Sequence, residues 1–299
     1  MGVWVRVLGS AAGGGFPQWN CGCPQCRAVR DGSRPCRPRT QSSIAVSADY
    51  RRWYLFNASP DIRAQIESFP ALHPRGLRDS PLRAVLLTDA ELDHTLGLLL
   101  LREAGHLEVH ATEAVRETLS GGTSLLPTLE AYARVDWRPV ETGVEVALGD
   151  GLSYRAFPVP TSKRARFGAG GGDGGVVGYR ITDGRTGRAL VYVPGAQGLT
   201  ASVLDQLEGC SCLLFDGTCW QDDELIRLGI ASKTSRDMGH LPIGGADGSL
   251  KQLARLPVER KIYVHINNTN PILIEDSPER RIVEERGLEV AADGLELEI

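Results

Sequence analysis

Residues 89–94, D-A-E-L-D-H, place three carboxylates and one imidazole within six positions. The run A-V-L-L-T before them has the length and composition of a buried strand. His265 lies in a second strand-like run, K-I-Y-V-H-I. Because ligands of α/β sheets bind at the carboxyl ends of strands, we expect Asp93, His94 and His265 to meet there.

Two imidazoles and one carboxylate form the facial triad of mononuclear non-haem iron(II) enzymes, which leaves coordination positions open for substrate and dioxygen. The set Asp93, His94 and His265 therefore predicts an active-site Fe²⁺, although other divalent metals remain alternatives. We expect catalytic roles for Asp89 and Glu91, as ligands, as acceptors of hydrogen bonds from the ligands or as acid/base groups. The alternative is a solvated acidic helix start, where carboxylates suit the helix dipole.

Three cysteines form the pattern C-x-C-x-x-C at Cys21, Cys23 and Cys26. Three thiolates in so short a turn predict a structural Zn²⁺ site, which needs a fourth ligand to become tetrahedral. Asn268 and Cys36 are the candidates for that ligand. The odd total of seven cysteines argues against a disulfide framework.

Other polar residues are candidates for contacts with a substrate. His240, in M-G-H-L-P, is a candidate catalytic acid or base, with a helix-capping histidine as the alternative. Asp216 and Thr218 follow the apolar run C-L-L-F and are candidate substrate contacts. Lys163 opens the basic loop T-S-K-R-A-R, which would suit a carboxylate-rich substrate but is also typical of a solvated loop.

The glycine-rich segment G-S-A-A-G-G-G-F begins at Gly9. It lacks the G-x-G-x-x-G and G-K-[ST] patterns of phosphate-binding loops, which argues against a nucleotide site. We expect its glycines to let the backbone approach a ligand or the metal centre closely.

Apolar or alternating runs of strand length recur along the whole chain, between segments with helix signals. Helices are predicted over 59–67, 96–103, 244–256 and 277–286. Ser277 and Pro278 form the start of the last one, and Gly287 ends it. This alternation predicts an α/β chain (α+β in some schemes), with two packed sheets and helices outside, as a single domain over residues 1–299.

The formal net charge of −4 gives no electrostatic basis for binding nucleic acid or an anionic membrane. No apolar run reaches the ~18 residues that a membrane span requires. The start M-G-V-W-V-R-V-L-G-S lacks the features of a signal peptide. The expected location is therefore cytoplasmic.

Several blocks, among them V-L-G-S-A-A-G-G-G-F-P-Q-W-N-C, L-L-T-D-A-E-L-D-H-T-L-G, F-D-G-T-C-W and H-I-N-N-T-N-P, resemble the PqqB family of pyrroloquinoline quinone (PQQ) biosynthesis. The resemblance runs nearly end to end and implies a metallo-β-lactamase αββα sandwich of two mixed sheets flanked by helices. It also implies a zinc-binding loop near residues 21–26 and a role in maturing a peptide-derived cofactor. The superfamily signature is H-x-H-x-D-H, whose first two histidines are Asp89 and Glu91 here.

The resemblance leaves three functions open. One is iron-dependent, O2-using hydroxylation of the tyrosine ring in the Glu-Tyr unit of the precursor, which the two-histidine, one-carboxylate set favours. The second is carriage of PQQ or its precursor toward the periplasm, and the third is hydrolysis with a single metal. The expected partners are the small peptide-derived substrate, other proteins of the pathway and a second copy of the chain.

Overall fold

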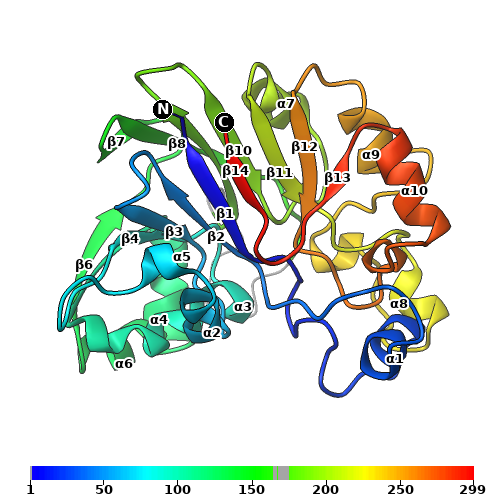
Figure 1. Cartoon of the computed structure of the whole chain (residues 1–299), viewed down its shortest axis with the longest axis horizontal. Helices are drawn as coiled ribbons and strands as arrows, with labels where there is room; N and C mark the ends of the chain where they lie inside the picture. The colour runs from blue at the N-terminus through cyan, green and yellow to red at the C-terminus, as the bar shows by residue number, and fades with distance from the viewer. Residues whose placement is uncertain (1, 164–166, 168–174) are drawn as a thin grey trace.

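The structure is a computed structural model that describes residues 2–163, 167 and 175–299. Residues 164–166 of the basic loop and most of the glycine-rich stretch 168–175 lie outside the described residues. In the described chain, two seven-stranded sheets pack face to face, with helices on their outer sides (Figure 1). The predicted fold class is confirmed.

The first sheet has the strand order β14-β1-β2-β3-β4-β5-β6. Its strands are β14 (Glu296–Glu298), β1 (Trp4–Gly9), β2 (Ser43–Ser47), β3 (Trp53–Phe56), β4 (Leu82–Leu86), β5 (His106–Ala111) and β6 (Arg134–Pro139). The pairs from β14 to β3 are antiparallel, and those from β3 to β6 are parallel.

The second sheet has the order β13-β12-β11-β10-β9-β8-β7. Its strands are β13 (Glu289–Val290), β12 (Arg260–Val264), β11 (Cys212–Asp216), β10 (Ala189–Val193), β9 (Val177–Asp183), β8 (Leu152–Pro158) and β7 (Glu145–Gly149). Strands β10 to β13 are parallel, and β7 to β10 are antiparallel. Each sheet therefore has a parallel part whose carboxyl ends can present polar side chains.

Apolar side chains from both sheets fill the space between them. Phe56 of β3 packs edge-on against Tyr179 of β9, with ring centroids 5.3 Å apart. Burial of such side chains contributes roughly 25 cal/mol for each Å² of apolar surface removed from water. This shared core fixes the two parallel parts relative to each other.

Helices cover the outer faces of the sheets (Figure 1). The chain forms α1 (Pro24–Asp31), α2 (Ile62–Glu67), α3 (Leu92–Thr95), α4 (Gly97–Leu100), α5 (Glu113–Glu117), α6 (Leu125–Glu130), α7 (Ala201–Leu207), α8 (Glu224–Arg227), α9 (Ser249–Leu253) and α10 (Pro278–Glu285). Side chains of α2, α4, α5 and α6 join the core outside the first sheet, and those of α1, α7, α9 and α10 join the core outside the second. Within the described chain, none of the helices combines the length and the apolar character that crossing a bilayer requires.

Three predicted helices differ from the structure. The helix expected over 59–67 is α2, which begins only at Ile62. The helix expected over 96–103 begins earlier and is interrupted at Leu96, between α3 and α4, so that α4 starts at Gly97. The backbone approaches so closely there that a Cβ on Gly97 would lie 2.2 Å from the carbonyl oxygen of Ser59. The helix expected over 244–256 is only the short α9. By contrast, Ser277 caps α10 as predicted, because its side chain accepts a hydrogen bond from the N–H of Arg280.

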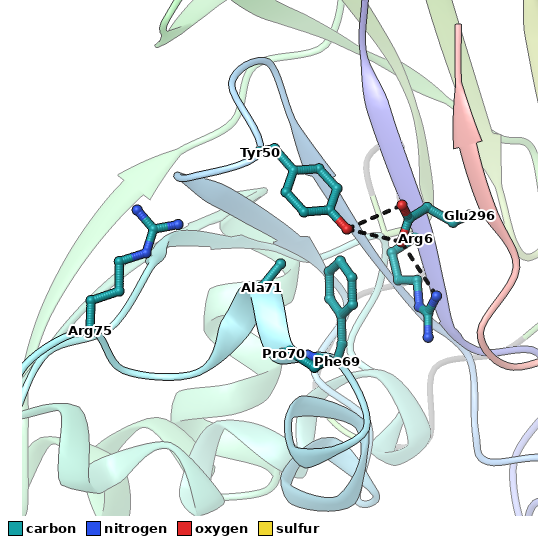
Figure 2. A pocket seen from close by; sticks show the side chains of 7 residues that line it. All are labelled: Arg6, Tyr50, Phe69, Pro70, Ala71, Arg75 and Glu296. Atoms are coloured by element: carbon teal, nitrogen blue, oxygen red, sulfur yellow. Dashed lines mark hydrogen bonds and ion pairs between the residues drawn. The ribbon is translucent and has the colours of Figure 1, made fainter.

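A surface hollow of about 460 Å³ lies beside β1, β14 and the 3-10 helix η1 (Pro70–Leu72) (Figure 2). The hydroxyl of Tyr50 donates to Glu296, and the guanidinium of Arg6 lies 4.7 Å from the ring centroid of Phe69. Tyr50 precedes β3, so the hollow is at the opposite end of that strand from the candidate metal ligands. It is separate from the site described next.

Candidate metal centre

The loop after β4 fixes one of the two histidines of the centre. Asn57 accepts a hydrogen bond from the N–H of Thr88, and the hydroxyl of Thr88 donates to Asp89 at 2.8 Å. Asp89 in turn accepts the Nδ1–H of His94, with Oδ2 at 2.7 Å and Oδ1 at 2.9 Å. Nδ1 is therefore committed to a carboxylate, which leaves Nε2 as the ligating atom.

Asp93 and His94 lie on α3, and His265 follows β12 from the other sheet. One oxygen of Asp93 lies 3.3 Å from Nε2 of His265 and 3.8 Å from Nε2 of His94. One donor atom from each of the three residues lies within 4.8 Å of the others. The structure thus brings together the three predicted ligands, although Asp93 and His265 are 172 positions apart in the chain.

Nε2 of His94 is buried and, among the described residues, has no hydrogen-bond partner. A buried nitrogen without a partner is costly unless something binds it. This nitrogen lies beside an oxygen of Asp93 and the imidazole of His265. Carboxylate oxygens and imidazole nitrogens are ligands of iron and zinc, so these atoms fit a divalent cation. The residues present therefore fit a metal ion.

The charges of the centre also favour a cation. Burial disfavours the imidazolium form of His94, but the carboxylates of Asp89 and Asp93 outweigh it and raise the pKa of His94 to about 9. Burial opposes ionisation of Asp93, yet His94 and His265 hold the pKa of its carboxyl well below the usual range. The same carboxylates that favour positive charge on His94 would also stabilise a bound cation.

Thr218 orients the second histidine. Its hydroxyl lies 2.6 Å from Oδ1 of Asp216, to which it donates, and 2.9 Å from Nδ1 of His265. Because a hydroxyl has one proton and it is given to Asp216, the Nδ1 of His265 carries the proton that Thr218 accepts. Nε2 of His265 is then free to ligate on the side of Asp93.

Asp216, His240 and His265 also form a group of potential metal ligands. However, the hydroxyl of Thr218 lies 3.1 Å from Nδ1 of His240 as well as close to Asp216 and His265. Oδ2 of Asp216 accepts from Nδ1 of His240 at 2.7 Å. The position between these residues is therefore filled by a hydroxyl, and the group is a hydrogen-bond network beside the metal centre.

Asp216 and Thr218 were predicted as substrate contacts, but the structure buries both under the histidines. Their contacts give them an orienting role toward His240 and His265. His240 was predicted as an acid/base residue. Its ring stacks on that of His265, with centroids 5.1 Å apart, so it lies at the centre but does not cap a helix.

Glu91 and Lys163 form an ion pair, with Oε1 and Nζ 2.8 Å apart. Both side chains are partly exposed. The aliphatic part of Lys163 lies close to Gly239, whose added Cβ would be 3.2 Å from Cδ. Lys163 therefore connects the D-A-E-L-D-H loop to the loop that carries His240.

The three cysteines form a second cluster, with their sulfurs within 4.8 Å of one another. The sulfur of Cys23 caps α1 by accepting from the N–H of Cys26. Nδ2 of Asn268 lies 3.3 Å from the sulfur of Cys26 and 3.7 Å from that of Cys23. Asn268 thus lies beside the cluster and donates to its sulfurs, whereas the thiol of Cys36 contacts the carbonyl of Arg34 and is outside the cluster. Burial raises the pKa of Cys23 to about 12, and a bound metal is what would deprotonate this thiol.

Comparison with known proteins gives the family. A family model described as beta-lactamase superfamily domain matches residues 52–266. Proteins named coenzyme PQQ synthesis protein B from Azoarcus sp. (strain BH72) and Methylococcus capsulatus are 49% and 47% identical, over 99% and 98% of this chain and 99% of each relative. The chain belongs to the coenzyme PQQ synthesis protein B family.

The crystal structure of Zn²⁺-bound PqqB from Methylobacterium extorquens has a TM-score of 0.91 and 44% sequence identity, and the match covers 99% of this chain and 100% of that one. A diphosphatase of the PhnP family has a TM-score of 0.70 at 20% identity and supports the fold alone. Membership of the PQQ synthesis protein B family confirms the resemblance seen in the sequence.

The glycine-rich loop that begins at Gly9 lies against the candidate metal centre. A Cβ on Gly13 would lie 3.2 Å from Oδ2 and 3.3 Å from Cγ of Asp93. The neighbouring Ala12 donates its N–H to the carbonyl of Ile266, next to His265. The loop therefore contacts the segments that carry Asp93 and His265. This is the close approach that we expected from its glycines.

We expect the Gly13→Ala variant to bind a divalent metal about tenfold more weakly, because the added methyl displaces the carboxylate of Asp93 and misplaced ligand surroundings cost 10–100-fold. The measurement is competition for Co²⁺ with a chromophoric chelator. The control is Gly198→Ala, where nothing lies within 4 Å of an added Cβ. Equal affinity in both variants would show that Asp93 does not need the space at Gly13.

Proposed function

We propose that this chain acts in PQQ synthesis as a mononuclear iron(II), dioxygen-dependent hydroxylase of the tyrosine ring in the Glu-Tyr-derived precursor. The observation that carries the proposal is the convergence of Nε2 of His94, Nε2 of His265 and one oxygen of Asp93. Both imidazoles have their Nδ1 atoms fixed elsewhere, so these three donors face one position. Three protein ligands leave the other coordination positions to substrate and dioxygen.

Hydrolysis with two metals is less well supported. Where the superfamily signature has its first two histidines, Asp89 is bound to His94 and Glu91 is paired with Lys163. The alternative second group, at Asp216 and His240, contains the hydroxyl of Thr218. These contacts favour a single metal ion at the centre.

When bound, Fe²⁺ would supply the redox chemistry that lets dioxygen react with an aromatic ring. Each insertion converts one ring C–H to C–OH and takes up one O2, two electrons and two protons while it releases one water. The electrons come from an external reductant. His240 is suited to take the proton of the phenol on Nε2, because its Nδ1 donates to Asp216.

Lys163 is suited to bind a carboxylate of the substrate. Its ammonium lies at the partly exposed edge of the centre, where it can exchange Glu91 for an incoming carboxylate. The Glu-Tyr unit carries such groups. We also propose that Cys21, Cys23 and Cys26 hold a structural Zn²⁺, as three clustered thiols suit that ion and the relative from M. extorquens is described as Zn²⁺-bound.

The test is anaerobic reconstitution with Fe²⁺, a Glu-Tyr dipeptide and a reductant, followed by admission of oxygen and mass spectrometry of the dipeptide. We expect a gain of one or two oxygen atoms. His94→Ala should show no gain, while His106→Ala, an exposed histidine on β5, should behave as the unmodified protein. An unchanged dipeptide mass, together with stoichiometric binding of the quinone, would favour the carrier function instead.

A further inference from the structure

The backbone of His265 adopts an unusual conformation. Its φ is +54°, in the left-handed region that side-chain-bearing residues rarely occupy. Such a conformation persists only when the surrounding structure holds it in place. Because His265 supplies one of the three converging donors, whatever holds residues 265–268 also holds the metal centre.

Two sets of backbone contacts hold the start of this segment. The N–H of Ile266 donates to the carbonyl of Ser10 at 2.9 Å, and the N–H of Ala12 donates to the carbonyl of Ile266 at the same distance. The N–H of Asn267 donates to the carbonyl of Thr218 at 3.0 Å. These contacts connect the segment to the glycine-rich loop and to the residues that follow β11.

The cysteine cluster holds its other end. Asn268 follows His265 by three residues, is buried, and has its amide nitrogen 3.3 Å from the sulfur of Cys26. The sulfur of Cys23 lies 3.6 Å from the backbone carbonyl of Asn268. Both the side chain and the backbone of Asn268 therefore contact the cluster, and Asn268 is only three residues away from His265 of the metal centre.

A second connection joins the same two regions of the chain. The N–H of Glu275 donates to the carbonyl of Pro35 at 2.8 Å, and Arg34 forms an ion pair with Asp276. The segment that follows the cysteines is thus bound to the segment that follows Asn268. Movement of one of them would be transmitted to the other.

We propose that the cysteine cluster is a positioning element for the metal centre: through Asn268 it keeps His265 in its left-handed conformation, with Nε2 directed at Asp93. This inference rests on the proposed function in one respect, which is that both clusters bind a metal ion. Zinc at the cysteines would then strengthen metal binding at the centre, and its loss would weaken it. Asn268 is accordingly a positioning residue that acts through His265.

The test measures affinity for Co²⁺ at the centre by competition with a chromophoric chelator, and counts zinc by elemental analysis. In Asn268→Ala the three thiolates remain, so we expect zinc to stay bound while Co²⁺ affinity at the centre falls 10–100-fold, as for other residues that orient a ligand. Cys26→Ser should lose zinc and show a fall at least as large. The matched control is Cys210→Ser, a buried cysteine outside the cluster, which should keep the affinity unchanged.

Wild-type Co²⁺ affinity in folded Asn268→Ala would overturn the inference. If Cys26→Ser does not fold, Asn268→Ala alone decides, with circular dichroism to verify its fold. The His94→Ala variant shows whether the Co²⁺ that is measured binds at the metal centre. If His94→Ala binds Co²⁺ as the unmodified protein does, the proposed metal centre itself is wrong; if it does not, an unchanged Asn268→Ala rejects only the coupling.

Discussion

Asp93→Asn should reduce metal affinity at the centre by more than about a hundredfold, since loss of a residue that merely orients a ligand already costs 10–100-fold. The oxygen of Asp93 lies between the Nε2 atoms of the two histidines, at 3.3 Å and 3.8 Å. An amide of the same size removes the negative charge that both imidazoles and the metal require. Hydroxylation should be lost with the metal.

Isothermal titration of the metal-free protein measures this effect. The control is Asp136→Asn, a carboxylate of β6 that pairs with His106 and Arg134 on the surface. It should bind metal normally. Unchanged affinity in Asp93→Asn would exclude Asp93 as a ligand and with it the two-histidine, one-carboxylate centre.

Removal of zinc from the cysteine cluster should lower the stability of the whole chain. A ligand present at a thousand times its Kd stabilises the folded state by about 4 kcal/mol. For a chain of this size each kcal/mol corresponds to about 2 °C in Tm, so zinc removal should lower Tm by about 8 °C. The cluster connects α1 to the segment after β12, which explains why the effect extends beyond the loop.

Differential scanning calorimetry with and without a chelator tests this prediction. Cys26→Ser should have a low Tm and a smaller response to the chelator, whereas Cys210→Ser should keep the full response. A chelator that leaves the Tm of the unmodified protein unchanged, after verified loss of zinc, would show that the cluster is not a structural metal site.

The sequence predicted the ligands because each follows an apolar strand. AVLLT and K-I-Y-V-H-I have the composition of buried strands, and parallel strands bring their carboxyl ends together. Asp93, His94 and His265 therefore met as expected. The clustering of the three thiols was equally predictable, because the pattern C-x-C-x-x-C keeps its cysteines within a short stretch of chain.

The hydrogen bonds between these residues could not be predicted. The ion pair of Glu91 with Lys163 joins residues 72 positions apart through a loop without a regular pattern. The orientation of His265 by Thr218 depends on the positive φ of the histidine, which no residue type at that position signals.

The replacement of two histidines by Asp89 and Glu91 has a physical explanation in these contacts. Asp89 accepts Nδ1–H of His94, and Glu91 pairs with a lysine, so neither carboxylate is free to build a second metal position. The chain keeps the fold of a metal hydrolase, with three converging donors for one metal ion. Three such donors around one metal ion would suit the oxygen chemistry proposed above.

The source of the oxygen in the product distinguishes dioxygen-dependent hydroxylation from hydrolysis. The Fe²⁺-reconstituted protein would be given the Glu-Tyr dipeptide and a reductant under ¹⁸O2 in unlabelled water. We expect ring hydroxyl groups that contain ¹⁸O, and no product from His94→Ala. Product oxygen that comes from water, or a metal-dependent cleavage of the dipeptide without oxygen uptake, would contradict the proposed hydroxylation.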